Sequence, residues 1–161
     1  MNISLNKITN YEINLNSKNL ENHRLLKDFL LNLNFQESNL NFDNSKLTFN
    51  ENVYISLNNT EFVSNTNGTF FKGEINFKIK NSDKLYKFFQ TNKKYRKEIK
   101  EIKVSFKINL LDNSYSFEKV SIDNQSNDQI QNVIKYYNKN NFNIIKRIEI
   151  KNLFNEIVSN L

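Results

Sequence analysis

The sequence of 161 residues has no cysteine, proline, alanine or tryptophan, and its only two glycines are Gly68 and Gly73. Without cysteine there is neither a disulfide framework nor a cysteine-ligated metal site. Two isolated glycines exclude a glycine-rich loop that cradles phosphates. No stretch approaches the roughly 18 consecutive apolar residues that a membrane-spanning helix needs. The length fits one domain, or part of one, built around a hydrophobic core.

Catalytic groups are equally sparse. His23 is the only histidine, so a histidine-based triad or metal site has no partners for it. Asp112, Asp123 and Asp128 lie near expected turns, where turn and cap chemistry accounts for them. We therefore expect a protein that is not an enzyme and that carries no metal and no cofactor.

The charge is positive, at +6, with 23 lysines and arginines against 17 acidic residues. Lysine dominates, and asparagine makes up about a fifth of the chain. Both have A/T-rich codons, so the charge does not by itself indicate a polyanionic partner. Proteins that read nucleic acids rely on arginine for bidentate contacts. The arginines here are Arg24, Arg96 and Arg147.

The strongest structural signal is Thr69–Lys80, in which apolar and polar residues alternate. Alternation gives a strand one apolar face and one polar face. At about 3.3 Å per residue, this strand would be roughly 40 Å long. Asn67-Gly68 before it predicts a turn. Gly73 interrupts the apolar face and predicts a bend, a bulge or a close backbone approach.

Short alternating segments fill the first part of the chain, with asparagine-rich turns between them. Such spacing predicts consecutive antiparallel hairpins. The expected strands lie at residues 3–5, 11–15, 28–36, 40–42, 47–49, 53–57 and 62–63. Residues 20–27 are ambiguous between a helical turn and a loop.

The second part mixes helices and strands. A helix is expected over Ser82–Gln90, capped by Ser82 or Asp83. A second long strand follows over Ile102–Leu110, and a turn at residues 112–114 leads into a third. In that third strand the apolar residues change parity, which predicts a bulge near Glu118–Lys119. Two more amphipathic helices are expected, one starting at Asn127 or Asp128 and one over residues 153–161.

This order predicts an α+β fold, with a β-rich antiparallel meander or β-groove sheet and amphipathic helices toward the C-terminus. Residues 1–66 would supply repeated short hairpins of the sheet. Residues 67–161 would supply the long-strand pair, its connecting helix and a helical cap. Three helices cannot cover the whole apolar face, so the sheet either closes on itself or forms a trough.

Four stretches carry a resemblance to a known family: FKGEINFKI, LYKFFQTNKKYRKEIKEI, SFEKVSIDN and the late KNLFNEI. They resemble the C-terminal region of AsmA-like proteins from A/T-rich alphaproteobacteria. The matching positions are Gly73, Tyr86, Phe88, Phe89, Gln90, Arg96, Ile122, Asp123 and Asn124. The chain departs from the family at Asn109-Leu110, where a Tyr-Asn pair is usual, and in having no proline in the basic segment.

The resemblance implies a periplasmic protein that is held in the inner membrane by an anchor upstream of this chain. The chain would then be a C-terminal fragment that continues upstream β-groove repeats. Its partner would be phospholipid or another acyl lipid, and its role would be phospholipid transport and outer-membrane assembly. If the chain is complete, a cytoplasmic location is expected instead.

The expected groove is lined by apolar residues of the two long strands, with basic residues of the 92–100 connection at its rim. The lining is Phe71, Ile75, Phe77, Ile79, Val104, Phe106, Ile108 and Leu110. The rim is Lys93, Lys94, Arg96 and Lys97. Three alternatives remain open. The lining can be an ordinary sealed core, the sheet can be a scaffold that pairs with neighbouring β-segments, or the basic segment can bind nucleic acid.

Overall fold

A computed structural model of the chain describes residues 11–19, 25–36, 39–66, 68–112, 114–140 and 146–161. Their strands form one antiparallel sheet, and the α+β fold expected from the sequence is confirmed. The strands are β1 (Tyr11–Asn19), β2 (Leu26–Gln36), β3 (Asn39–Asn41), β4 (Lys46–Phe49), β5 (Val53–Asn65), β6 (Gly68–Ile79), β7 (Glu101–Asn109) and β8 (Tyr115–Ile122). The helices are α1 (Ser82–Phe89), α2 (Asp128–Lys139) and α3 (Arg147–Ser159), with a 3₁₀ turn, η1, at Lys93–Tyr95.

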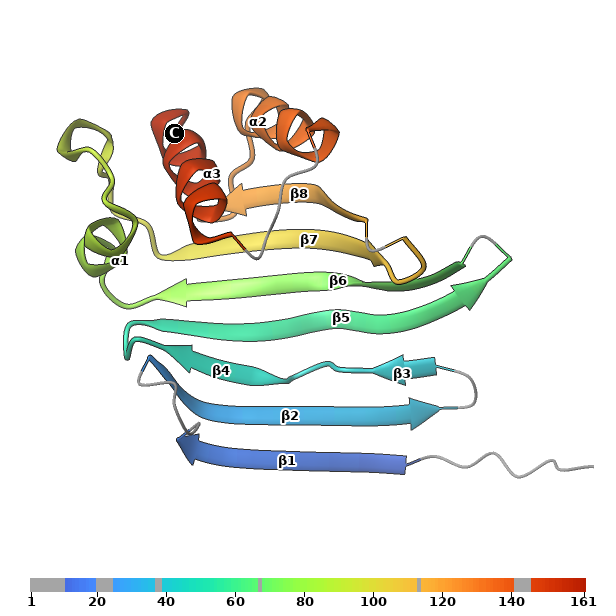
Figure 1. Cartoon of the computed structure of the whole chain (residues 1–161). Coiled ribbons are helices and arrows are strands. Elements are labelled where there is room, and N and C mark those ends of the chain that lie inside the picture. Colours follow the sequence, from blue (N-terminus) through green and yellow to red (C-terminus); the bar gives the residue numbers. More distant parts are fainter. Residues whose placement is uncertain (1–10, 20–24, 37–38, 67, 113, 141–145) are drawn as a thin grey trace, which may run out of the picture.

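The sheet is a meander in which neighbouring strands follow one another along the chain (Figure 1). β3 and β4 share one position, because each pairs with both β2 and β5. All three helices gather at the end of the sheet formed by β6, β7 and β8 (Figure 1). The helical cap that was expected toward the C-terminus therefore covers only part of the sheet.

The two long strands are adjacent and antiparallel, as predicted, with Phe77 opposite Ile102 and Phe71 opposite Ile108. α1 connects them. The register between β7 and β8 shifts by one residue at Ser105/Phe106, which confirms the predicted bulge at Glu118–Lys119. Both faces of the sheet keep their character across this shift because the bulge absorbs the change of parity.

Gly73 is a point of close backbone approach. A Cβ atom built at this position would lie 2.6 Å from Thr60 Cα and still nearer to Thr60 Oγ1. Thr60 sits there because β5 bulges between Asn58 and Glu61. Glycine is therefore required by the packing of the neighbouring strand, one of the three readings that the sequence allowed.

Some details differ from the sequence predictions. Residues 53–57 and 62–63 belong to one strand, β5. The bulge at Thr60 shifts the register by one residue, so the apolar side chains before and after it lie on the same face and the strand continues. The N-cap of α1 is Asn81, whose side chain accepts a hydrogen bond from Lys84 N, and not Ser82 or Asp83. The predicted strand at residues 3–5 and His23 lie outside the described residues.

The buried hydrophobic core lies between the helices and the strands that they cover. Its buried residues are Val53, Ile79, Leu85, Tyr86, Ile99, Val120, Ile122, Ile130, Val133, Ile134, Leu153, Ile157 and Val158. α3 is tied to α1 by Asn155, which donates to Phe89 O at 3.1 Å and accepts from Thr91 Oγ1 at 2.5 Å. Phe154 also stacks on Phe89, with ring centroids 4.3 Å apart. The helices thus form a fixed cover over one end of the apolar face.

Candidate apolar groove

The apolar side chains of the sheet lie on one face. Residues directly opposite each other in an antiparallel pair share a face. Ile55 is opposite Phe77, Phe77 is opposite Ile102, and Ile75 is opposite Val104. The same face continues toward the N-terminal strands through Phe62, Leu40, Phe35, Leu33, Leu31, Ile13 and Leu15. A single apolar surface therefore runs across the sheet from β8 to β1.

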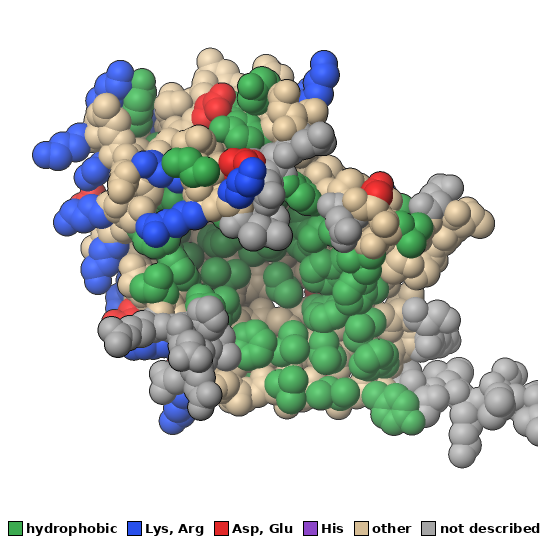
Figure 2. Space-filling view, viewed as in Figure 1, with side chains coloured by type: hydrophobic (Ala, Val, Ile, Leu, Met, Phe, Trp, Pro, Cys, Tyr) green, Lys and Arg blue, Asp and Glu red, His purple; other side chains and the backbone are tan. Residues whose placement is uncertain are grey.

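Beyond the helices this surface is open. Tyr11, Ile13 and Leu15 on β1 are 60%, 44% and 51% exposed, and Phe35 on β2 is 37% exposed. Figure 2 shows hydrophobic side chains spread over the front of the sheet below the helices. Large contiguous apolar patches on a protein surface usually mark interaction sites, whereas single exposed apolar residues are common on any surface. The apolar face is thus the leading functional feature of this protein.

Where the open face meets the helices it deepens into a cavity of about 490 Å³. This volume is within the roughly 300–1,000 Å³ range of small-molecule sites. Sheet residues supply its floor: Phe49, Val53, Ile55, Ile75, Phe77, Ile79, Ile102, Val104, Phe117 and Val120. Residues of α1, α2 and α3 supply its wall: Leu85, Phe88, Phe89, Ile134, Arg147, Ile150, Leu153, Phe154 and Ile157.

The predicted lining residues divide into two groups. Ile75, Phe77, Ile79 and Val104 line the cavity. The other four do not: Phe71, Phe106, Ile108 and Leu110. Of these, Leu110 lies past the end of β7 and is 43% exposed. The sequence thus identified the correct face of the sheet, whereas the position of the cavity along it depends on where α1 and α3 pack.

Phe71 and Phe106 belong to an aromatic row instead of the cavity. Phe71 contacts Phe106, Phe62 and Phe42, with ring centroids 5.3, 4.8 and 5.3 Å apart. Phe106 is only 5% exposed, so at this position the sealed-core alternative describes the side chain better than an open lining does. The row extends the apolar floor beyond the cavity, from Phe42 directly after β3 across β5, β6 and β7.

The predicted basic rim lies away from the cavity, since none of its four residues is among the lining residues. The guanidinium of Arg96 donates to Thr91 O through Nε at 3.1 Å and through an Nη atom at 2.9 Å, and so holds the turn after α1. Lys93, Lys94 and Lys97 are exposed on and after η1, with Lys94 Nζ above the Tyr95 ring at 4.5 Å.

The charged residue at the cavity is Arg147, which the sequence analysis did not select. Of the described residues that line the cavity, it is the only charged one. It begins α3, and its guanidinium lies 4.9 Å from the centroid of the Phe88 ring. A signal was available in the sequence, because a basic pair stands directly before the last amphipathic helix.

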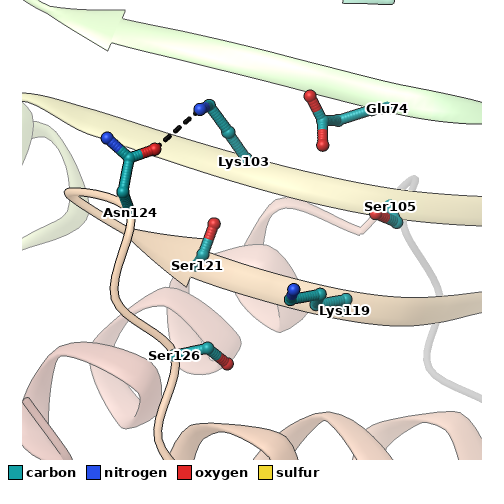
Figure 3. A pocket seen from close by; sticks show the side chains of 7 residues that line it. All are labelled: Glu74, Lys103, Ser105, Lys119, Ser121, Asn124 and Ser126. Carbon is teal, nitrogen blue, oxygen red and sulfur yellow. Dashed lines mark hydrogen bonds between the residues drawn. The ribbon is translucent and has the colours of Figure 1, made fainter. Parts of the chain in front are cut away.

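The opposite face of the sheet is polar and has a small hollow of about 220 Å³ over β6, β7 and β8 (Figure 3). Its lining is Glu74, Lys103, Ser105, Lys119, Ser121, Asn124 and Ser126. Lys103 donates to Asn124 Oδ1 at 2.7 Å and pairs with Glu101 at 3.1 Å. The hydrogen bond from Asn76, aided by Lys103, lowers the pKa of the Glu101 carboxyl. The arrangement is a polar surface joined by hydrogen bonds and an ion pair.

The two edge strands of the sheet, β1 and β8, differ in how their outer backbone groups are hydrogen-bonded. On β8 these groups bond to side chains of α2 and of the segment before it. Asn138 pairs with the backbone of Phe117, and Gln131 and Ser126 donate to Val120 O at 2.8 and 3.1 Å. Among the described residues, β1 pairs only with β2. Edge strands offer free backbone groups to another strand, so extension of the sheet is possible at β1 and opposed at β8.

The described part of the chain holds no cluster of three or more histidine, cysteine or acidic side chains that could bind a metal ion. None of its helices has the length and apolarity needed to cross a bilayer. No known family model matches the chain, and no curated protein or solved structure is significantly similar to it. Functional inference therefore depends on the geometry of the apolar face, its cavity and its edges.

Proposed function

We propose that this chain is a lipid-binding β-groove segment of an AsmA-like envelope protein. The observation that carries the proposal is the continuous apolar face, which is open over β1 and β2 and hollowed under α1 and α3. Acyl chains would lie along this face, where each buried CH₂ contributes about 0.8 kcal/mol. No bond is broken in this role.

Acyl chains suit this surface better than a folded protein partner does. Backbone groups of the inner strands are engaged in the sheet, so the floor offers few directional contacts. A flexible chain needs none, since the hydrophobic effect depends on buried apolar area alone. In an AsmA-like protein this activity would belong to the periplasm and to phospholipid transport between the membranes.

A second candidate function is favoured by the difference between the edges. Side chains bond the outer edge of β8, whereas β1 pairs only with β2 among the described residues, so β1 is the side at which the sheet can be lengthened. A neighbouring β-segment paired with β1 would make the chain the terminal unit of a longer sheet. This scaffolding role is compatible with lipid binding, because an added strand would extend the same apolar face.

Photo-crosslinking tests the lipid proposal. A photoreactive amino acid replaces Phe77, which lines the cavity, and the purified chain is mixed with phospholipid vesicles. We expect lipid adducts detectable by mass spectrometry, because acyl chains would pass within reach of this position.

The matched control is Tyr54, which is 49% exposed and lies one residue before Ile55, so that it points to the polar face. The same amino acid at Tyr54 should give few adducts. Equal labelling at the two positions, or none at position 77 in a chain whose circular dichroism is unchanged, would retire the lipid-groove proposal in favour of the scaffold.

A further inference from the structure

Arg147 occupies a specific place relative to the cavity. It is the first residue of α3, it lines the cavity, and it is exposed to solvent. The other described lining residues are apolar. A cation in such a position meets both the water outside and the apolar interior, which is where the polar head of an amphiphile would lie.

The guanidinium of Arg147 has donors available. Its Cζ atom lies over the ring of Phe88, and this single contact with an aromatic ring leaves N–H donors of the guanidinium for an anion. Within the described residues it forms no ion pair, whereas its neighbour Lys146 pairs with Glu149 at 3.5 Å. The dipole of α3, which begins at Arg147, adds partial positive charge at the same place. The mouth of the cavity thus carries a positive charge that forms no ion pair with a described carboxylate.

We infer that Arg147 makes the cavity selective for amphiphiles with an anionic head, a phosphate or a carboxylate, whose acyl chain fills the apolar cavity. This inference rests on the proposed lipid-binding function and assigns headgroup recognition within it. The alternative cations are less well placed. Arg96 is held by Thr91 O, and Lys93 on η1 is not among the residues that line the cavity.

The test compares probes that share one acyl chain and differ in head: oleoyl lysophosphatidate, oleate and the uncharged monoolein. Binding to the 161-residue chain is measured by equilibrium dialysis, with each probe below its critical micelle concentration. We expect lysophosphatidate or oleate to bind more tightly than monoolein. Arg147→Ala should weaken the anionic probes about tenfold, the loss of one charge-assisted hydrogen bond, and leave monoolein unchanged. Arg147→Lys should retain part of the preference.

Lys93→Ala is the matched control, because it removes an exposed positive charge away from the cavity. It should leave the binding of all three probes unchanged, and the thermal unfolding of each variant checks its fold. An unaltered preference in Arg147→Ala, or a loss in Lys93→Ala, would overturn the inference. Competition by inorganic phosphate as strong as that by lysophosphatidate would also overturn it, by making Arg147 a site for free anions.

The assay separates this inference from the proposed function. If the wild-type chain binds all three probes equally, the lipid-binding groove stands and anionic selection by Arg147 is wrong. If it binds none of them, both are wrong. A difference between oleate and lysophosphatidate identifies which anionic head the site prefers.

Discussion

Asn138 on α2 completes the backbone hydrogen bonding of Phe117 on β8. Its Oδ1 accepts from Phe117 N at 2.9 Å, and its Nδ2 donates to Phe117 O at 2.7 Å. One side-chain amide thus takes the place of the residue that a neighbouring strand would supply. Edge strands are commonly protected against pairing with other chains, and here a helix does so with a single side chain.

The first prediction follows from this pair. Asn138→Leu removes both hydrogen bonds at a half-buried position. We expect the free energy of unfolding to fall by about 1–3 kcal/mol, which is the usual cost of losing two hydrogen bonds at a half-buried site. The uncovered edge should also increase self-association, measured by sedimentation velocity. Asn132→Leu, at an exposed position on the same helix, is the control and should change neither quantity.

The second prediction concerns Gly73. A Cβ atom there would overlap the backbone of Thr60, with 2.6 Å to its Cα, so one strand has to shift. Gly73→Ala should therefore destabilise the chain by about 1–3 kcal/mol, the usual cost of overpacking a fitted site, as measured by urea unfolding. Adding Thr60→Ala should restore only part of the loss, because the backbone contact remains. Full rescue by Thr60→Ala would contradict this explanation.

The third prediction distinguishes the open apolar face from the sealed core. Leu15 is 51% exposed on β1, whereas Ile130 on α2 is 1% exposed and does not line the cavity. Leu15→Asp should change stability by less than about 1 kcal/mol, because its charge stays in water. Ile130→Asp should unfold the chain, because a buried carboxylate has no partner there. The measurement is thermal unfolding followed by circular dichroism. Comparable losses in the two variants would mean that the face at β1 is covered.

The fourth prediction concerns pH. Burial, with a hydrogen bond to Glu156, raises the pKa of the Tyr137 hydroxyl to about 12. In the unfolded chain it would ionise near its ordinary value of about 10. Its contribution to stability is therefore complete below pH 10 and is lost as the pH rises through 12. The difference in stability between wild type and Tyr137→Phe should therefore be constant below pH 10 and should shrink as the pH rises from 10 to 12. A difference that changes between pH 5 and 8 would contradict the assignment.

A large part of the fold could be predicted from the sequence because its signals are local. Alternation over Thr69–Lys80 depends only on the two-residue period of a strand, and β6 follows it within a residue at each end. The parity change before Val120 located the β8 bulge in the same way. The α+β class and the shared apolar face follow from these periodic patterns, because the alternation within each strand indicates which of its faces is apolar.

The location of the candidate site along that face was decided by tertiary structure. The cavity exists where α1 and α3 stand over β5, β6 and β7, and their positions depend on contacts such as that of Asn155 with Phe89. These contacts join residues 66 positions apart, and no local pattern encodes them. Arg96 and Arg147 illustrate the difference: both stand next to lysines in the sequence, but folding engages one with Thr91 O and places the other at the cavity.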